Sequence, residues 1–225
     1  MATDEESRMY SLTVLISGNG TNLQALIDAC GKAPLQNARI TRVISNKGAA
    51  FGLTRAQNAS IPTKYHNLVS GGYKKKYPDD VQKAREEYDI DLANIITQDQ
   101  PKPDLVVCAG WMHILSPKFI DALTAANVPI INLHPALPTQ FDGANAIGRA
   151  WEAYQKGDIA VTGVMIHYVI SEVDRGEPII VEEVECRGCD TESALEERIH
   201  GVEWKLVVQG TAKALSNIQS KERGG

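Results

Sequence analysis

The chain has 225 residues, of which 43% are hydrophobic and 23% charged, and its formal net charge is −5. A length of this order suits one domain with a full hydrophobic core, and the composition is that of a globular protein rather than a disordered one. The acidic balance argues against nucleic acid as a partner, because no basic surplus is available to neutralise phosphates; the basic run YKKKY at 73–77 is interpreted as solvated surface.

The N-terminus, the hydropathy and the cysteines together predict a cytoplasmic protein. The first eleven residues, MATDEESRMYS, are polar and acidic and lack the pattern of a signal peptide. No apolar stretch approaches the ~20 residues that span a bilayer, so no membrane association is expected. The four cysteines are too few and too scattered for a disulfide scaffold. Cys186 and Cys189 have CxxC spacing, but no second pair accompanies them, so they are interpreted as structural and no metal site is expected.

Short apolar runs and helical patterns alternate along the first two thirds of the chain. Strands are predicted at 11–17, 38–45, 61–66, 104–110 and 128–134. Helices are predicted at 21–30, 49–59 and 79–97, and a further short one begins at Ser116-Pro117. Alternation of this kind implies right-handed crossovers and an α/β fold with a doubly wound, mostly parallel sheet.

The last third of the chain adds a strand pair and a long helix. After a helix at 145–157, two longer strands at 160–170 and 177–186 are joined by a polar turn, which predicts a hairpin added to the sheet. A C-terminal helix is predicted at 191–218. We therefore expect a single domain at 11–218, with flexible tails at 1–10 and 219–225.

Three of the predicted strands end in chemically unusual sequences. These are SGNGTN at 17–22, AGWMHIL at 109–115 and NLHPALP at 132–138. In doubly wound sheets, ligands bind outside the carboxyl ends of the strands, near the point where the strand order reverses. We expect these three strand ends to converge on one edge and to form the functional site.

The glycine loop SGNGTNLQ at 17–24 joins the first strand to the first helix. Its glycines permit close approach of a ligand, and the free N–H groups of Gly20, Thr21 and Asn22 favour an anion. It is not a P-loop, because no Gly-Lys-Ser/Thr follows, and a nicotinamide dinucleotide is not expected, because Leu23 replaces the third glycine of that fingerprint. The loop is interpreted as a monophosphate site; a plain glycine turn that binds nothing is the alternative.

Asn132 and His134 lie two residues apart at the end of the fifth strand, so their side chains share a face. The amide suits a developing oxyanion, and the imidazole exchanges a proton near neutral pH. The alternative is a hydrogen-bonded histidine at a strand end. A carboxylate would orient the imidazole, and the turn after the sixth strand offers Glu172, Asp174 and Glu177. Spacing leaves the choice among these three open.

Four motifs together resemble the phosphoribosylglycinamide formyltransferases (glycinamide ribonucleotide transformylases) of purine synthesis. They are VLISGNGTNLQALIDA, PDLVVCAGWMHILSP, INLHPALP and HYVISEVDRGEPII, which occur in the family's order within residues 11–215. The resemblance implies a Rossmann-like formyltransferase fold and an enzyme that transfers a formyl group from 10-formyltetrahydrofolate to the amine of 5'-phosphoribosylglycinamide (glycinamide ribonucleotide). The folate is a cosubstrate, no metal or nicotinamide is implied, and a monomer or weak homodimer is expected.

The resemblance also implies roles for individual residues. The catalytic residues are Asn132, His134 and Asp174. The ribonucleotide is held by Gly20, Thr21, Asn22 and Glu203. The folate is held by Arg85, Met112, His113, Ile114 and Leu115, together with Asn132 and Asp174. Protonated His134 and Asn132 are expected to stabilise the oxyanion, with Asp174 raising the pKa of His134 and, through an ordered water, carrying the proton from the amine to the leaving nitrogen.

Two residues depart from the family pattern. His113 stands where bacterial relatives often carry arginine, and its side chain is expected to point outward while the backbone contacts the pterin. Ile147 stands where many members have a histidine. Neither departure touches the catalytic trio.

Three other functions compete with this interpretation. A methionyl-tRNA formyltransferase would need an additional RNA-binding domain and a basic face. A formylfolate hydrolase usually carries an added N-terminal regulatory module. A non-catalytic nucleotide-binding module would explain the glycine loop but would leave the catalytic trio without a purpose.

Overall fold

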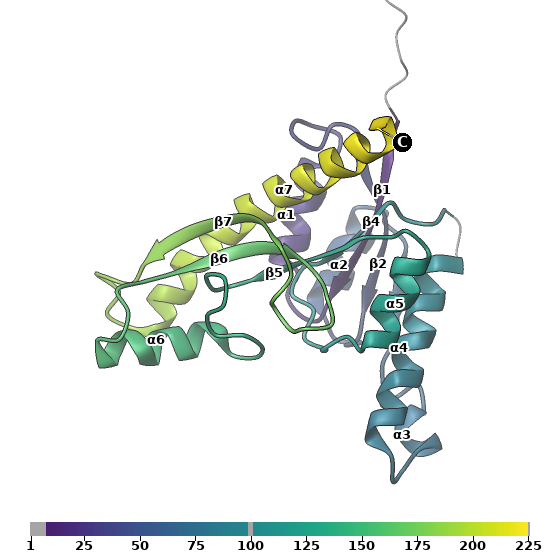
Figure 1. The fold of residues 1–225 in the computed structure, drawn as a ribbon, viewed down its shortest axis with the longest axis horizontal. Coiled ribbons are helices and arrows are strands. Elements are labelled where there is room, and N and C mark those ends of the chain that lie inside the picture. Colours follow the sequence, from purple (N-terminus) through teal and green to yellow (C-terminus); the bar gives the residue numbers. More distant parts are fainter. Residues whose placement is uncertain (1–7, 99–100, 225) are drawn as a thin grey trace, which may run out of the picture.

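The computed structural model describes residues 8–98 and 101–224, and a single seven-stranded sheet forms its centre (Figure 1). The strand order is β3-β2-β1-β4-β5-β6-β7. The first five strands in this order pair in parallel, whereas β6 and β7 form an antiparallel hairpin on the edge next to β5. The predicted α/β class, with a doubly wound sheet and an added strand pair, is therefore confirmed.

Each strand and helix predicted from the sequence has a counterpart in the structure. The strands are β1 Tyr10–Ile16, β2 Ala38–Ser45, β3 Thr63–Tyr65, β4 Leu105–Cys108, β5 Ile130–His134, β6 Val161–Tyr168 and β7 Pro178–Glu185. The helices are α1 Thr21–Ala29, α2 Phe51–Asn58, α3 Tyr73–Lys76, α4 Val81–Gln98, α5 Pro117–Ala125, α6 Ala146–Lys156 and α7 Glu192–Gly224. The short α3 was not predicted; it forms inside the basic run, whose lysines are exposed as expected.

The sheet separates two hydrophobic clusters, and β1 contributes to both. All seven residues of β1 are buried, with Leu12 and Val14 facing one cluster and Leu15 the other, as the two-residue period of a strand requires. The first cluster includes side chains of α1 and α7, and the second includes side chains of α4 and α5. Helices therefore cover both faces of the central strands, which explains why these strands are almost continuously apolar.

Both ends of the domain extend further than the sequence predicted. Residues 1–7 of the predicted N-terminal tail lie outside the described residues, but Arg8 pairs with Asp104 and Glu222, and β1 already begins at Tyr10. At the other end, α7 continues to Gly224, so residues 219–224 are helical instead of leaving the helix as a tail. Basic residues in the last turn favour this extension, because they interact well with the negative end of the helix dipole.

The carboxyl ends of β1, β4 and β5 lie side by side. The Ser17 N–H donates to the Gly110 carbonyl at 2.9 Å, which joins the loops after β1 and β4. Cys108, the last residue of β4, is in register with Asn132 of β5. The strand order reverses between β1 and β4, so this edge is the switch point at which α/β sheets bind their ligands.

Two further observations concern the fold as a whole. Among the helices of the described residues, none combines the length and the apolar character needed to cross a membrane. All four cysteines are free thiols.

Candidate active site

The carboxyl end of β5 brings Asn132 and His134 to a common partner. That partner is Asp174, in the turn between β6 and β7. The Asn132 amide nitrogen lies 3.2 Å from Asp174 Oδ1, and His134 Nδ1 lies 3.4 Å from Asp174 Oδ2. His134 is only 3% exposed. The shared face predicted from the two-residue spacing is therefore a buried polar cluster at the sheet edge.

The structure distinguishes Asp174 from the other two carboxylates of this turn. Glu172 and Glu177 are exposed, whereas Asp174 Oδ2 accepts a hydrogen bond from the Gly143 N–H at 2.8 Å. Asp174 has a φ of 56°, a left-handed conformation that aspartate adopts more readily than most residues. Burial alone would raise the pKa of its carboxyl, but contacts with the His167 ring and the Gly143 N–H hold that pKa below its usual range. Asp174 is therefore a carboxylate at neutral pH.

His134 is neutral at pH 7 in the free protein. Burial lowers the pKa of its imidazole, and the Asp174 carboxylate only partly opposes this effect. Asp174 thus acts in the expected direction, but burial has the larger effect on the pKa of His134. A neutral imidazole at this place can accept a proton from a substrate.

The lowered pKa of His134 predicts a pH dependence of stability. The unfolded chain binds a proton at this histidine below pH ~6.5, whereas the folded protein resists it. The free energy of unfolding of the wild type should therefore fall, relative to that of His134→Gln, as the pH decreases from ~7 to ~5. Denaturant titrations at several pH values measure this difference. A difference that stays constant over this range would show that His134 is not held neutral by the fold.

His167 of β6 is a fourth member of the cluster, and it was not singled out from the sequence. Its Nε2 lies 3.2 Å from the Asn132 amide nitrogen and 3.4 Å from Asp174 Oδ1. Its Nδ1 donates to the Tyr168 carbonyl at 2.8 Å, and its Nε2 faces both the Asn132 amide and the Asp174 carboxylate. The sequence signal that could have identified His167 is a histidine in a largely apolar strand, just before the acidic turn. That signal does not give its partner, because only the β5–β6 register places His167 opposite Asn132.

The glycine loop leads into α1 with an open helix N-terminus. Gly20 is the N-cap residue, with a φ of 75°, and no side chain caps the first turn. A Cβ atom at Gly20 would lie 2.6 Å from the Cα of Gly52, so only glycine allows α2 to pack this closely. Arg55 of α2 also holds the loop, because its Nε donates to the Asn19 carbonyl at 2.9 Å and its Nη2 to Asn19 Oδ1 at 3.2 Å. The first N–H groups of α1 are thereby presented in a fixed geometry that suits an anion.

Asn22 and Glu203, which are far apart in the sequence, meet beside this loop. The Asn22 Nδ2 donates to Glu203 Oε2 at 3.0 Å, and the two residues are 7% and 5% exposed. Burial raises the pKa of the Glu203 carboxyl, and the bond from Asn22 opposes this. The Oδ1 of Asn22 is buried and has no hydrogen-bond partner among the described residues. An unsatisfied buried acceptor next to a helix N-terminus is available to a donor on a bound ligand.

Exposed apolar side chains flank the end of β5 on two loops. Met112 and Ile114, after β4, are 68% and 54% exposed, and Ile170 and Val173, in the β6–β7 turn, are 41% and 37% exposed. Large apolar side chains left in water beside a polar cluster are typical of a surface that a flat, largely apolar ligand covers.

The remaining residues of the expected folate site differ in their exposure and in their contacts. Arg85 Nη2 donates to the Ile114 carbonyl at 3.4 Å, a long bond that still places it beside the segment. Leu115 is half-buried against the cluster beneath α4 and α5. His113 was expected to point outward, and this is wrong: its side chain is 10% exposed, with Nε2 2.7 Å from Asp89 Oδ1. His113 can therefore meet a ligand at this edge through its backbone only.

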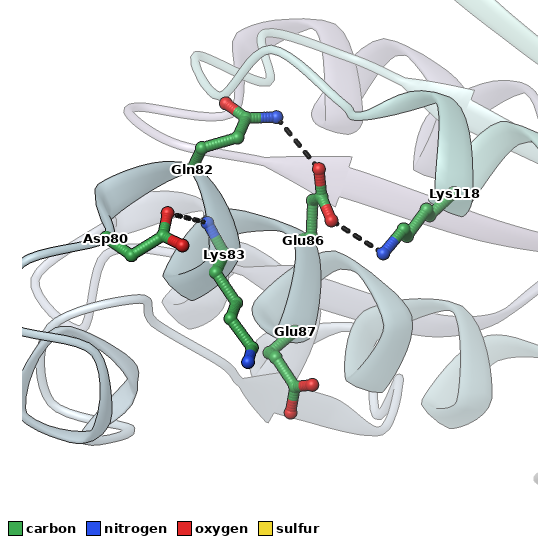
Figure 2. Close-up of a pocket in the computed structure, with 6 residues that line it drawn as sticks. All are labelled: Asp80, Gln82, Lys83, Glu86, Glu87 and Lys118. Carbon is green, nitrogen blue, oxygen red and sulfur yellow. Dashed lines mark hydrogen bonds and ion pairs between the residues drawn. The ribbon is translucent and has the colours of Figure 1, made fainter.

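A separate groove of about 270 Å³ lies at the start of α4 and is lined by charged side chains (Figure 2). Lys118 pairs with Glu86 at 2.6 Å, and Gln82 donates to the same carboxylate at 3.1 Å. Asp80 accepts from the Lys83 N–H at 2.9 Å, in the manner of a helix cap. These groups satisfy one another on the surface, so the groove does not have the chemistry of the site at the sheet edge.

Two other sequence features concern metals and Ile147. Within residues 8–98 and 101–224, no three histidine, cysteine, aspartate or glutamate side chains are grouped so that they could hold a metal ion. Ile147, the departure in α6, packs against the hydrophobic cluster beneath α1 and α7. Isoleucine at this position is thus explained by packing.

Comparison with known proteins gives one consistent result. Residues 11–211 match the formyl transferase family. The chain is 50% identical over 208 residues to the phosphoribosylglycinamide formyltransferase of Schizosaccharomyces pombe, covering 92% of this chain and 98% of that protein. It is 44% identical over 216 residues to that of Saccharomyces cerevisiae, covering 93% and 99%. The crystal structure of glycinamide ribonucleotide transformylase 1 from Symbiobacterium toebii is similar with a TM-score of 0.76 and 30% identity, covering 92% of this chain and 90% of that one.

Proposed function

The chain belongs to the formyl transferase family, and on this basis we propose that it transfers a formyl group from 10-formyltetrahydrofolate to the amine of 5'-phosphoribosylglycinamide, a step of purine biosynthesis. The observation that carries the proposal is the meeting of Asn132, His134 and Asp174 at one sheet edge. The anion loop after β1 and the exposed apolar segment after β4 adjoin each other at the same sheet edge. A phosphorylated amine held by the loop and a folate held by the segment would therefore meet near the cluster.

The ribonucleotide phosphate binds the N–H groups of Gly20, Thr21 and Asn22 at the start of α1. The uncapped first turn supports this, because its donors and the positive end of the helix dipole both favour a phosphate. The buried, unpartnered Oδ1 of Asn22 and the carboxyl of Glu203 supply acceptors for hydroxyl or amine groups of the same substrate. The folate lies against Met112 and the segment up to Leu115, with Arg85 beside it.

The reaction forms a bond from the amine nitrogen to the formyl carbon and breaks the bond from that carbon to N10 of the folate. The formyl oxygen becomes an oxyanion in the tetrahedral intermediate. Asn132 donates to this oxygen by giving up one of its two 3.2 Å contacts, which are long and therefore weak. One well-placed donor of this kind contributes about 3–4 kcal/mol to the lowering of the barrier.

His134 and Asp174 move the proton that the amine must lose. Neutral His134 accepts this proton, and the Asp174 carboxylate stabilises the imidazolium that results. The proton then passes to the leaving N10 nitrogen, so no net charge is left on the enzyme. The lowered pKa of His134 supports this order of events, because the resting imidazole has a free acceptor.

A spectrophotometric assay of tetrahydrofolate formation tests the proposal. Product should form only when both 10-formyltetrahydrofolate and the ribonucleotide are present, and its rate should saturate with each of them. Tetrahydrofolate formation that does not depend on the ribonucleotide would favour a formylfolate hydrolase. No turnover, together with binding of the ribonucleotide alone, would favour a non-catalytic module.

Replacing Gly20 with alanine is expected to damage the phosphate loop. The substitution forces a left-handed φ of 75° on a residue with a side chain and brings its Cβ to 2.6 Å from Gly52 Cα. We expect a loss of about 1–3 kcal/mol in the free energy of unfolding and a raised KM for the ribonucleotide. Denaturant unfolding and steady-state kinetics measure these two effects.

Gly18→Ala is the matched control for this prediction. Gly18 belongs to the same loop, but it is exposed, has no positive φ, and a Cβ there meets nothing within 4 Å. Its free energy of unfolding should stay within about 0.5 kcal/mol of the wild type. Equal destabilisation by the two substitutions would contradict the conformational role given to Gly20.

We also propose a cytoplasmic location, a single domain and a monomer or weak homodimer. The free state of all four cysteines supports a reducing compartment, and the family match over residues 11–211 supports one domain. Analytical ultracentrifugation over a range of protein concentrations tests the assembly state. A concentration-independent dimer would contradict it.

A further inference from the structure

The segment from Met112 to Ser116 has two exposed side chains among more buried ones. Met112 and Ile114 are 68% and 54% exposed, whereas the His113 side chain is 10% exposed and Ser116 is 9% exposed. The outward pair forms the apolar wall that the proposed function assigns to the folate. The contacts that keep Met112 and Ile114 exposed therefore determine the shape of that wall.

Asp89 of α4 bonds to both ends of the inward side of this segment. Its Oδ1 lies 2.7 Å from His113 Nε2, and its Oδ2 accepts from the Ser116 N–H at 2.7 Å. The Asp89 side chain is completely buried. A buried carboxylate is tolerated only when hydrogen bonds compensate its lost hydration, and these two bonds do so. One carboxylate thus holds both the His113 ring and the Ser116 N–H, and so restrains residues 113–116 at their two ends.

The His113 ring has little freedom to move away from Asp89. It packs edge-on against Tyr88 at 5.0 Å between centroids and against Trp111 at 6.3 Å. On the other side of the loop, the Met112 N–H donates to Ser17 Oγ at 2.8 Å. The segment is thereby anchored both to the end of β1 and to α4, at short distances throughout.

We propose that Asp89 and His113 are a positioning pair for the formyl donor: their hydrogen bond holds residues 112–116 so that Met112 and Ile114 face the folate. This inference rests on the proposed function. Neither side chain is a substrate contact in this proposal, because Asp89 is fully buried and the His113 side chain is only 10% exposed. The pair acts on folate affinity through residues 112–116, whereas the ribonucleotide loop has further anchors of its own in Arg55 of α2 and Glu203 of α7.

Steady-state kinetics of His113→Ala and Asp89→Asn test the pair. His113→Ala removes the anchor and should raise the KM for 10-formyltetrahydrofolate about tenfold or more, with the KM for the ribonucleotide within about twofold of the wild type. Asp89→Asn is nearly isosteric and keeps the acceptor for the Ser116 N–H, and its NH2 group can donate to His113 Nε2 when the ring proton is on Nδ1, so it should fold and show a smaller increase. The double variant should be no worse than His113→Ala alone, because the two side chains act as one unit.

Asp91→Asn is the matched control on the same helix. Asp91 is exposed and its carboxylate accepts from the Tyr73 hydroxyl at 2.7 Å, away from residues 112–116. This variant should keep both KM values. Circular dichroism and a folate analogue titrated by fluorescence check folding and affinity without turnover.

The possible failures can be told apart. A wild type without ribonucleotide-dependent turnover would overturn the proposed function. An active wild type whose folded His113→Ala variant keeps its folate KM within about twofold would overturn the positioning pair. Equal increases in both KM values would do the same, since they would indicate general damage.

Discussion

Replacing His134 with alanine is expected to lower kcat for formyl transfer by about 10²–10⁴-fold, the range that a positioned general acid–base group contributes. The substitution removes the neutral imidazole that accepts the amine proton, and it leaves Asn132 and Asp174 in place. Both substrates should still bind, because neither the α1 N-terminus nor the apolar segment depends on this ring. Single-turnover kinetics with saturating substrates measure the chemical step directly.

His66→Gln is a suitable control for the loss of a half-buried histidine. The His66 ring stacks on Tyr88 at 4.5 Å, and burial lowers its pKa as it does for His134. Replacing His66 should lower the free energy of unfolding without a comparable loss of kcat, because His66 lies outside the cluster around Asp174. A His134→Ala variant that folds and keeps near-normal kcat would remove His134 from the mechanism.

Replacing Asp174 with asparagine should reduce kcat by a similar factor of about 10²–10⁴, as the loss of the orienting carboxylate does in comparable sites. Asparagine also tolerates the left-handed φ of 56° and can keep the bond from the Gly143 N–H, so the turn should retain its shape. The negative charge that stabilises the imidazolium of His134 is lost, together with the second oxygen, which accepts from the Asn132 amide. Presteady-state kinetics, with substrate affinities measured separately, check this expectation.

Glu172→Gln and Glu177→Gln are the matched controls, because they neutralise the other two carboxylates of the same turn. Both side chains are exposed rather than part of the buried polar cluster, so their kcat values should stay within about twofold of the wild type. If Glu172→Gln lost as much activity as Asp174→Asn, the acidic partner would have been assigned to the wrong residue.

The sequence predicted the fold largely because each local pattern agrees with the global topology. The apolar runs of β1, β4 and β5 can only be buried strands, and the residues that follow them interrupt this pattern with glycine, amide and imidazole groups. Parallel strands bring such endings to one edge. Hence the pairing of Asn132 with His134 on one face could be predicted from a spacing of two residues.

The rest of the site depends on contacts between distant parts of the chain. Asp174 is distinguished from Glu172 and Glu177 by its left-handed backbone, the Gly143 N–H and its contacts with the β5 side chains. His167 joins the cluster only through the β5–β6 register, and Asp89 reaches His113 only because α4 packs against the loop after β4. The direction of the His134 pKa depends on the balance of burial against one carboxylate, which no sequence pattern contains.

The fate of the formyl carbon tests the central claim most directly. With 10-formyltetrahydrofolate labelled with ¹³C in the formyl group, NMR of the reaction mixture should show the label in the N-formyl amide of the ribonucleotide, and the rate should fall about 10²–10⁴-fold in Asp174→Asn. Label that accumulates as formate, at a rate independent of the ribonucleotide, would contradict the proposed transfer.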